Sequence, residues 1–181
     1  ERFLQVRAKL YGYLADPQRT LRQYPLSDTS LAANYARAFA YHKDALVNEA
    51  LASTETLLAS DPDNPYYLEL QGQILLESGR PDEALIPLRR ATELTRNEPL
   101  IASVFGHALI ATEDTTNYDE AERVLRAAVA RDRFNPFAWY QLGVVYAERG
   151  DIPRARLASE EQQVMNDDFS SALRIAMAAE A

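Results

Sequence analysis

The residues best suited to catalysis are few and widely separated in this 181-residue chain. Its two histidines, His42 and His107, are 65 residues apart, and neither belongs to the His-Glu-x-x-His pattern that binds zinc in many peptidases. No second ligand stands at helical spacing from either one, so a structural or groove-lining role is favoured over metal binding. The chain has no cysteine, which excludes thiolate metal sites and a cysteine nucleophile.

The adjacent carboxylates Glu160–Glu161 and Asp167–Asp168 also make a poor acid–base pair. Neighbouring residues of a helix point to different faces, so a solvated surface is the simpler interpretation. The sequence contains no glycine-flanked nucleophilic serine and no glycine-rich phosphate loop. We therefore predict no catalytic residue, no cofactor-binding residue and no metal ligand in this segment.

Charge and hydropathy narrow the possible partners. The formal net charge is −8, and an acidic chain repels phosphate backbones, so we expect no nucleic-acid binding. The arginine clusters Arg89–Arg90 and Arg131–Arg133 are interpreted as a solvated outer face. No apolar run is long enough to span a membrane. The chain begins at Glu1 without a methionine or a leader, so we interpret it as part of a longer protein.

The strongest pattern is an internal repeat of about 34 residues, as in helical repeat proteins. The recurring residues are a proline and, seven positions later, a glycine: Pro65 and Gly72, Pro99 and Gly106, and Pro136 and Gly143. Within a unit, apolar residues follow helical spacing and a break falls near the middle, so each unit is predicted to be two helices. Small residues at Gly72 and Ala84 would let these two helices approach closely. The third unit has three extra residues, expected in a loop at 113–117.

This pattern resembles the tetratricopeptide repeat (TPR), most clearly through Trp139, Leu142, Gly143, Tyr146, Gly150 and Ala155. The resemblance implies an all-α fold, a right-handed α-solenoid of helix hairpins with flanking N- and C-terminal helices. We predict connector helices over 1–30 and a repeat array over 31–181. The predicted units are about 31–64, 65–98, 99–135 and 136–165, with a C-terminal capping helix at 168–180.

In the TPR family, the first helix of each unit lines a concave groove that binds a partner. The candidate groove residues that the resemblance implies here are Tyr35, Phe39, His42, Tyr66, Glu69, Gln73, Leu76, Leu100, Ser103, His107, Ile110, Phe137, Tyr140 and Val144. Large aromatic side chains of this kind anchor many interfaces. The alternative, that several of them simply bury against neighbouring helices, stays open. Only Lys43 resembles the carboxylate clamp of chaperone-tail binders, so that activity is disfavoured.

Several longer phrases resemble one particular group of TPR proteins. They are Asp16-Pro17, Thr20-Leu21-Arg22-Gln23-Tyr24-Pro25, Tyr35-Ala36-Arg37-Ala38, Pro62-Asp63-Asn64-Pro65-Tyr66 and Asn135-Pro136-Phe137-Ala138-Trp139. Together they are similar to the C-terminal half of bacterial periplasmic zinc metallopeptidases of the beta-barrel assembly-enhancing protease type. The zinc ligands and catalytic glutamate of that family lie in a preceding domain, so zinc would be a cofactor of the parent enzyme and not of this segment.

The resemblance implies a periplasmic, non-catalytic domain that recruits protein or peptide partners for outer-membrane protein quality control. Its partners would be unfolded outer-membrane proteins, the assembly machinery and its own peptidase domain. An unfolded barrel strand exposes alternating apolar side chains, which an apolar groove could bind. The alternative is a stand-alone TPR adaptor or assembly scaffold with no attached enzyme.

Overall fold

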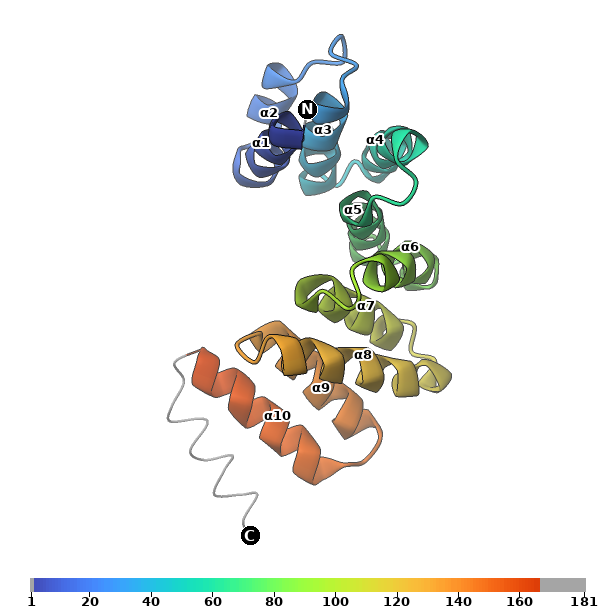
Figure 1. Ribbon diagram of the computed structural model, residues 1–181, viewed down its shortest axis with the longest axis vertical. Coiled ribbons are helices and arrows are strands. Elements are labelled where there is room, and N and C mark those ends of the chain that lie inside the picture. The colour runs from blue at the N-terminus through green and yellow to red at the C-terminus, as the bar shows by residue number, and fades with distance from the viewer. Residues whose placement is uncertain (1, 167–181) are drawn as a thin grey trace. The chain divides into compact units, whose positions relative to one another are not determined.

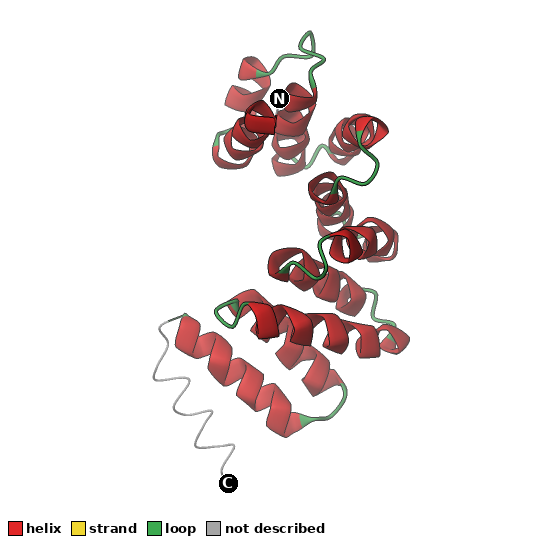
Figure 2. Ribbon diagram, viewed as in Figure 1, coloured by secondary structure: helices red, strands yellow, loops and turns green. Residues whose placement is uncertain are grey.

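The computed structural model describes residues 2–166 and contains only helices and connecting loops in that range (Figures 1 and 2). The predicted all-α class is confirmed. The helices group into two compact units, residues 1–91 and 92–181, with the boundary inside one helix. The predicted capping helix at 168–180 lies outside the described residues.

Unit 1 contains the helices up to residue 91. These are α1 (Arg2–Leu14), α2 (Pro17–Gln23), α3 (Leu31–Lys43), α4 (Val47–Ser60), α5 (Pro65–Glu77) and most of α6 (Pro81–Leu94). Helix α3 packs on α4, and α4 packs on α5. Two successive helical hairpins, α3–α4 and α5–α6, therefore begin at Leu31 and Pro65.

Unit 2 continues from residue 92. Its elements are α7 (Pro99–Ala111), the short 3₁₀ helix η1 (Thr115–Asn117), α8 (Tyr118–Arg131), α9 (Pro136–Glu148) and α10 (Ile152–Met165). Helix α7 packs on α8 and α9, α8 packs on α9, and α9 packs on α10. The three extra residues of the third unit fall where η1 forms, between the two helices of a hairpin.

Proline and a preceding polar residue start the first helix of most hairpins. Asn64 Oδ1 accepts a hydrogen bond from the Tyr66 backbone N–H at 3.1 Å, and Asn135 Oδ1 accepts one from the Ala138 N–H at 2.9 Å. Glu98 takes the same place before α7. Each cap satisfies a backbone donor that the helix itself leaves unpaired, and proline at the first position lacks that donor.

Close contact within the hairpins occurs at the glycines. A methyl group added at Gly72 would collide with the Leu88 side chain, and one added at Gly106 would lie 2.5 Å from Leu125 Cγ. The atoms nearest to each added methyl group belong to a leucine of the second helix, so each glycine makes room for a large, fully buried side chain.

Helix α1 packs along α3, so the N-terminal segment belongs to unit 1 (Figure 1). A Cβ at Gly12 would lie 2.7 Å from the Ala36 carbonyl oxygen, which shows how closely the two backbones approach. The Lys43 ammonium donates hydrogen bonds to the carbonyls of Tyr13 and Ala15, at 3.1 and 2.6 Å. The role of residues 1–30 as a connector to a further domain stays a prediction.

A side chain of α8, Arg131, holds the loop between α6 and α7 in place. Arg96 and Asn97 both adopt positive φ, 54° and 60°, an uncommon conformation for residues with side chains. Arg131 Nη1 donates to both of their carbonyl oxygens, at 2.6 Å each. Arg131, expected only as part of a solvated cluster, therefore fixes a strained turn.

Candidate functional site

Two of the predicted groove residues are covered by α1. Tyr35 is 4% exposed and Phe39 is 8% exposed. The Phe39 ring packs edge-on against Tyr13 of α1, and the Tyr35 ring packs edge-on against Tyr67 of α5. Although nearly buried, Tyr35 lines a hollow between α1 and α5 and Phe39 lines the hollow next to it, so both side chains lie at the floor of that groove.

The Tyr35 hydroxyl is buried and makes no hydrogen bond in the structure. Burial, followed by the negative charge of Glu69, raises the pKa of this phenol. The group therefore stays protonated and neutral through the physiological range. An unpaired buried hydroxyl costs about 1–3 kcal/mol of stability.

A groove remains open between α1 and α5 and is called here the α1–α5 groove. It consists of two adjoining hollows of about 660 and 290 Å³ that share Lys9, Leu10 and Tyr66. Glu69 and Gln73 line the smaller hollow. Tyr66 is 52% exposed and Tyr13 is 62% exposed, so the groove has two exposed tyrosine rings.

Lys9 and three carboxylates line this groove, with Asp61 and Asp63 in the larger hollow and Glu69 in the smaller one. The Lys9 ammonium lies 5.3 Å from the centre of the Tyr66 ring and 4.0 Å from Glu69 Oε2. A cation above an aromatic face is held by the ring's negative surface, while its long stem stays apolar. The groove therefore offers an apolar wall with a positive charge and a carboxylate at its centre.

Polar side chains connect α3 to the C-terminal end of α5. His42 Nε2 is 3.0 Å from Glu77 Oε2, and Gln73 Nε2 donates to Glu77 Oε1 at 2.8 Å. Leu76, another predicted groove residue, is 9% exposed. Here the predicted groove positions connect α3 to α5, and only His42 and Gln73 keep partial exposure.

In unit 2 the predicted positions form a surface across α7 and α9, called the α7–α9 face. Leu100, Phe137 and Tyr140 are exposed, at 62%, 41% and 52%. The His107 ring packs edge-on against Phe137 with ring centres 5.7 Å apart. Ile110 and Val144, which complete this face, are half-buried. The surface is apolar, aromatic and largely free of charge.

Ser103 does not belong to that surface, although its position predicted it. The side chain is fully buried, donates to the Pro99 carbonyl at 2.5 Å and accepts a hydrogen bond from Asn135 Nδ2 at 3.1 Å. Asn135 also caps α9. Ser103 therefore ties α7 to the start of α9.

Sequence reasoning missed the contribution of α1. Lys9 and Leu10 line the groove, yet they lie outside the repeats from which groove positions were counted. The available signal was the row of apolar residues along residues 3–14, which no repeat explains. That row leaves Val6, Leu10 and Leu14 exposed in the structure.

No cluster of three or more histidine, cysteine, aspartate or glutamate side chains suited to a metal ion occurs within residues 2–166. Over the same residues, every helix is too short or too polar to cross a membrane.

Comparisons with known proteins point to repeat proteins. Residues 111–164 match the tetratricopeptide repeat family, and residues 43–128 match the family of subunit 3 of the anaphase-promoting complex, or cyclosome. No curated protein sequence matches the chain significantly.

Solved structures of TPR proteins superpose on most of the chain. YrrB, described as a TPR protein with an unusual peptide-binding site, has a TM-score of 0.71 and 26% identity over 94% of this chain and 88% of its own. MamA has a TM-score of 0.67 and 22% identity over 78% of this chain and 81% of its own. A MamA double mutant has a TM-score of 0.75 and 15% identity over 94% and 96%. At such low identity, the MamA structures show a shared fold alone.

Proposed function

Because this chain is a tetratricopeptide-repeat protein, we propose that it is a non-catalytic module that binds apolar peptide segments of a partner protein. The α1–α5 groove and the α7–α9 face are the two binding surfaces. The observation that carries the proposal is the exposure of large apolar side chains at groove positions, namely Tyr66, Leu100 and Tyr140. Aromatic side chains give a large contact area at low entropic cost.

The geometry favours an apolar peptide over a charged one. The α7–α9 face is built from Leu100, Phe137 and Tyr140, with half-buried Ile110 and Val144 beside them. In the α1–α5 groove, Lys9 lies 4.0 Å from Glu69 and Arg90 lies 2.9 Å from Asp63, so these two pairs offset most of the charge that lines it. The similarity to YrrB, described as having a peptide-binding site, supports the same class of ligand.

The test is titration of the chain with a fluorescently labelled, unfolded segment of an outer-membrane protein. We expect saturable binding below ~100 μM, a weak but measurable affinity for a single groove. Tyr66→Ser and Tyr140→Ser should each weaken binding about fivefold, since each removes one apolar anchor. The control is Ile86→Ser, which removes a 77% exposed apolar side chain of α6 outside both surfaces. Absence of binding at that concentration, or equal effects of all three substitutions, would refute the proposal.

The finer assignment concerns the parent protein. We propose that the chain is the partner-recruiting arm of a periplasmic zinc metallopeptidase, with unfolded outer-membrane proteins or their assembly machinery as partners. Its support is the family resemblance of residues 9–25, which generic repeats do not explain, together with the exposed apolar row of α1. A stand-alone TPR adaptor fits the similar families and structures equally well. Sequencing the gene upstream of Glu1 separates the two, because only the first requires a His-Glu-x-x-His domain there.

A further inference from the structure

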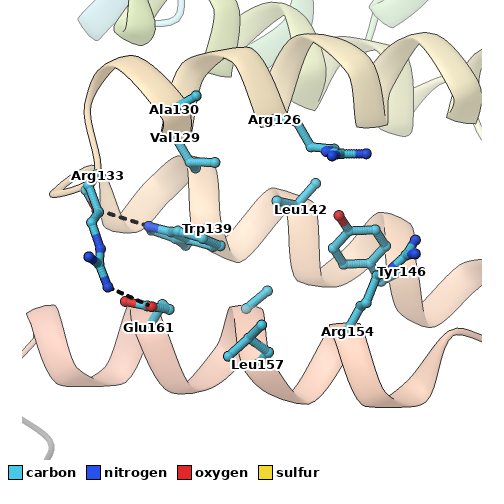
Figure 3. Close-up of a pocket in the computed structure, with 11 residues that line it drawn as sticks. Arg126, Val129, Ala130, Arg133, Trp139, Leu142, Tyr146, Arg154, Leu157 and Glu161 are labelled. Carbon is cyan, nitrogen blue, oxygen red and sulfur yellow. Dashed lines mark hydrogen bonds and ion pairs between the residues drawn. The ribbon is translucent and has the colours of Figure 1, made fainter.

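A second cleft lies in unit 2, apart from the α7–α9 face (Figure 3). It runs between α8 and α10, over the side of α9 that carries Trp139, Leu142 and Tyr146, and has a volume of about 590 Å³. We call it the α8–α10 cleft. The groove residues of α9, Tyr140 and Val144, do not line it.

The floor of this cleft is apolar and held in place. The Trp139 indole N–H donates to the Arg133 carbonyl at 2.9 Å, which fixes the orientation of the ring. Leu142 is buried beneath it, while Leu157 of α10 is 53% exposed. A rigid tryptophan beside an exposed leucine provides a preformed apolar binding site for a side chain of a partner.

Three arginines surround this floor, namely Arg126, Arg133 and Arg154 (Figure 3). Their side chains are 65%, 72% and 60% exposed. Among the described residues that line the cleft, Glu161 is the only acidic one. On a chain of net charge −8, this is a local concentration of positive charge.

Each of the three arginines is paired with a carboxylate of the chain. Arg126 lies 3.5 Å from Glu122, and Arg133 lies 3.4 Å from Glu161. Arg154 lies 3.3 Å from Asp151, 4.0 Å from Glu122 and 5.6 Å from the centre of the Tyr146 ring. Because the arginine ends of these ion pairs are exposed to solvent, each pair contributes little to stability, at about 0–1 kcal/mol. Carboxylates of a partner can therefore replace them, and guanidinium groups suit such pairing well.

We propose that the α8–α10 cleft binds an acidic amphipathic helix of a partner protein. An apolar side chain of that helix would rest on Trp139 and Leu157, and its carboxylates would pair with the three arginines. Glu161 then acts as an internal competitor, because it pairs with Arg133 when the cleft is empty. This surface differs in position and charge from the two surfaces of the proposed function.

Trp139 is the single tryptophan of the chain and reports directly on this cleft. The probe is a capped synthetic helix of about 15 residues with leucine and phenylalanine on one face and glutamate on the other, a length at which helices are marginally stable alone. We expect a saturable change of Trp139 emission with this peptide. A matched peptide with lysine in place of every glutamate should leave the emission unchanged at the same concentrations.

Two substitutions at one ion pair give opposite expected results. Arg133→Gln should weaken binding about fivefold, whereas Glu161→Gln should tighten it about threefold, because it removes the competitor. A purely structural role of the pair would shift both in the same direction. Arg123→Gln is the control, since Arg123 lies on α8, pairs with Glu120 at 3.1 Å and does not line the cleft.

The proposal is overturned if the lysine peptide changes the emission as much as the glutamate peptide, or if Arg133→Gln and Glu161→Gln act alike. It is also overturned if vesicles of anionic lipid change Trp139 emission and the glutamate peptide does not. Tyr66→Ser should leave this titration unchanged, because Tyr66 belongs to unit 1. The outcome is therefore independent of peptide binding to the α1–α5 groove.

Discussion

Adding one methyl group at Gly106 tests how the hairpins of this protein are packed. The new Cβ would lie 2.5 Å from Leu125 Cγ and 2.6 Å from Cδ2. Leu125 is fully buried, so its side chain has no open space into which it could move. Overpacking of this kind costs about 1–3 kcal/mol, while alanine in place of glycine recovers about 1 kcal/mol of helix propensity. We expect Gly106→Ala to destabilise the chain by up to about 2 kcal/mol.

The matched control is Gly143→Ala, one repeat later in the same unit. Its added Cβ would lie 3.5 Å from Ala158 Cβ and 3.7 Å from Ser159 Oγ, which are ordinary contact distances. Without a clash, only the propensity gain remains. We expect Gly143→Ala to stabilise the chain by about 0.5–1 kcal/mol. The opposite sign at two equivalent positions follows from the size of the facing side chain.

Urea unfolding followed by circular dichroism measures both variants, with an unchanged slope required for the comparison. The double variant Gly106→Ala, Leu125→Ala adds a sharper check. Leu125→Ala alone should cost about 2–5 kcal/mol, and the Gly106 methyl group should fill part of the resulting cavity. The double variant should therefore be less destabilised than the sum of the single ones. Strict additivity, or a stabilising Gly106→Ala, would refute the packing argument.

Three further outcomes follow from single side chains. Tyr35→Phe should stabilise the chain by about 1 kcal/mol, since it removes an unpaired buried hydroxyl. The advantage should grow above about pH 10, because the unfolded tyrosine ionises there while burial raises the pKa of the folded one. A difference in unfolding free energy between wild type and variant that does not change with pH would contradict this. Arg131→Met should destabilise the chain by about 1 kcal/mol in urea unfolding, because the carbonyls of Arg96 and Asn97 lose their donor; an unchanged midpoint would count against it. Lys43→Met should speed hydrogen exchange of α1, whose last carbonyls Lys43 holds, and unaltered exchange would show that apolar packing alone is sufficient.

The helices and their starts could be predicted because their signals are local. Proline after asparagine or glutamate satisfies or removes the unpaired donors of a helix, and this pattern marks Pro65, Pro99 and Pro136 in the sequence itself. The repeat period then places the hairpins one after another. Contacts between helices are less local. The sequence indicates close approach at Gly72 but not that the side chain nearest to it is Leu88, because helix rotation decides which residues face each other.

The candidate site could be predicted only in part, for the same reason. Tyr66, Leu100 and Tyr140 are exposed at groove positions, as the repeat pattern indicates. Tyr35 and Phe39 occupy equivalent positions but are buried under α1, a segment outside the repeat. Counting positions within a repeat cannot show what a flanking helix covers. The α8–α10 cleft was missed because Arg126, Arg133 and Arg154 lie on α8, on the loop after α8 and on α10, and do not form one run in the sequence.

The packing of α1 over α3 determines how this protein should be truncated for expression. A fragment beginning at Leu31, where the first hairpin starts, would uncover Tyr35 and Phe39 and leave Lys43 without its two carbonyls. Such a fragment would expose a new aromatic patch. It should therefore aggregate or dimerise at concentrations at which the whole chain does not. The smallest well-behaved version of unit 1 therefore has to retain α1.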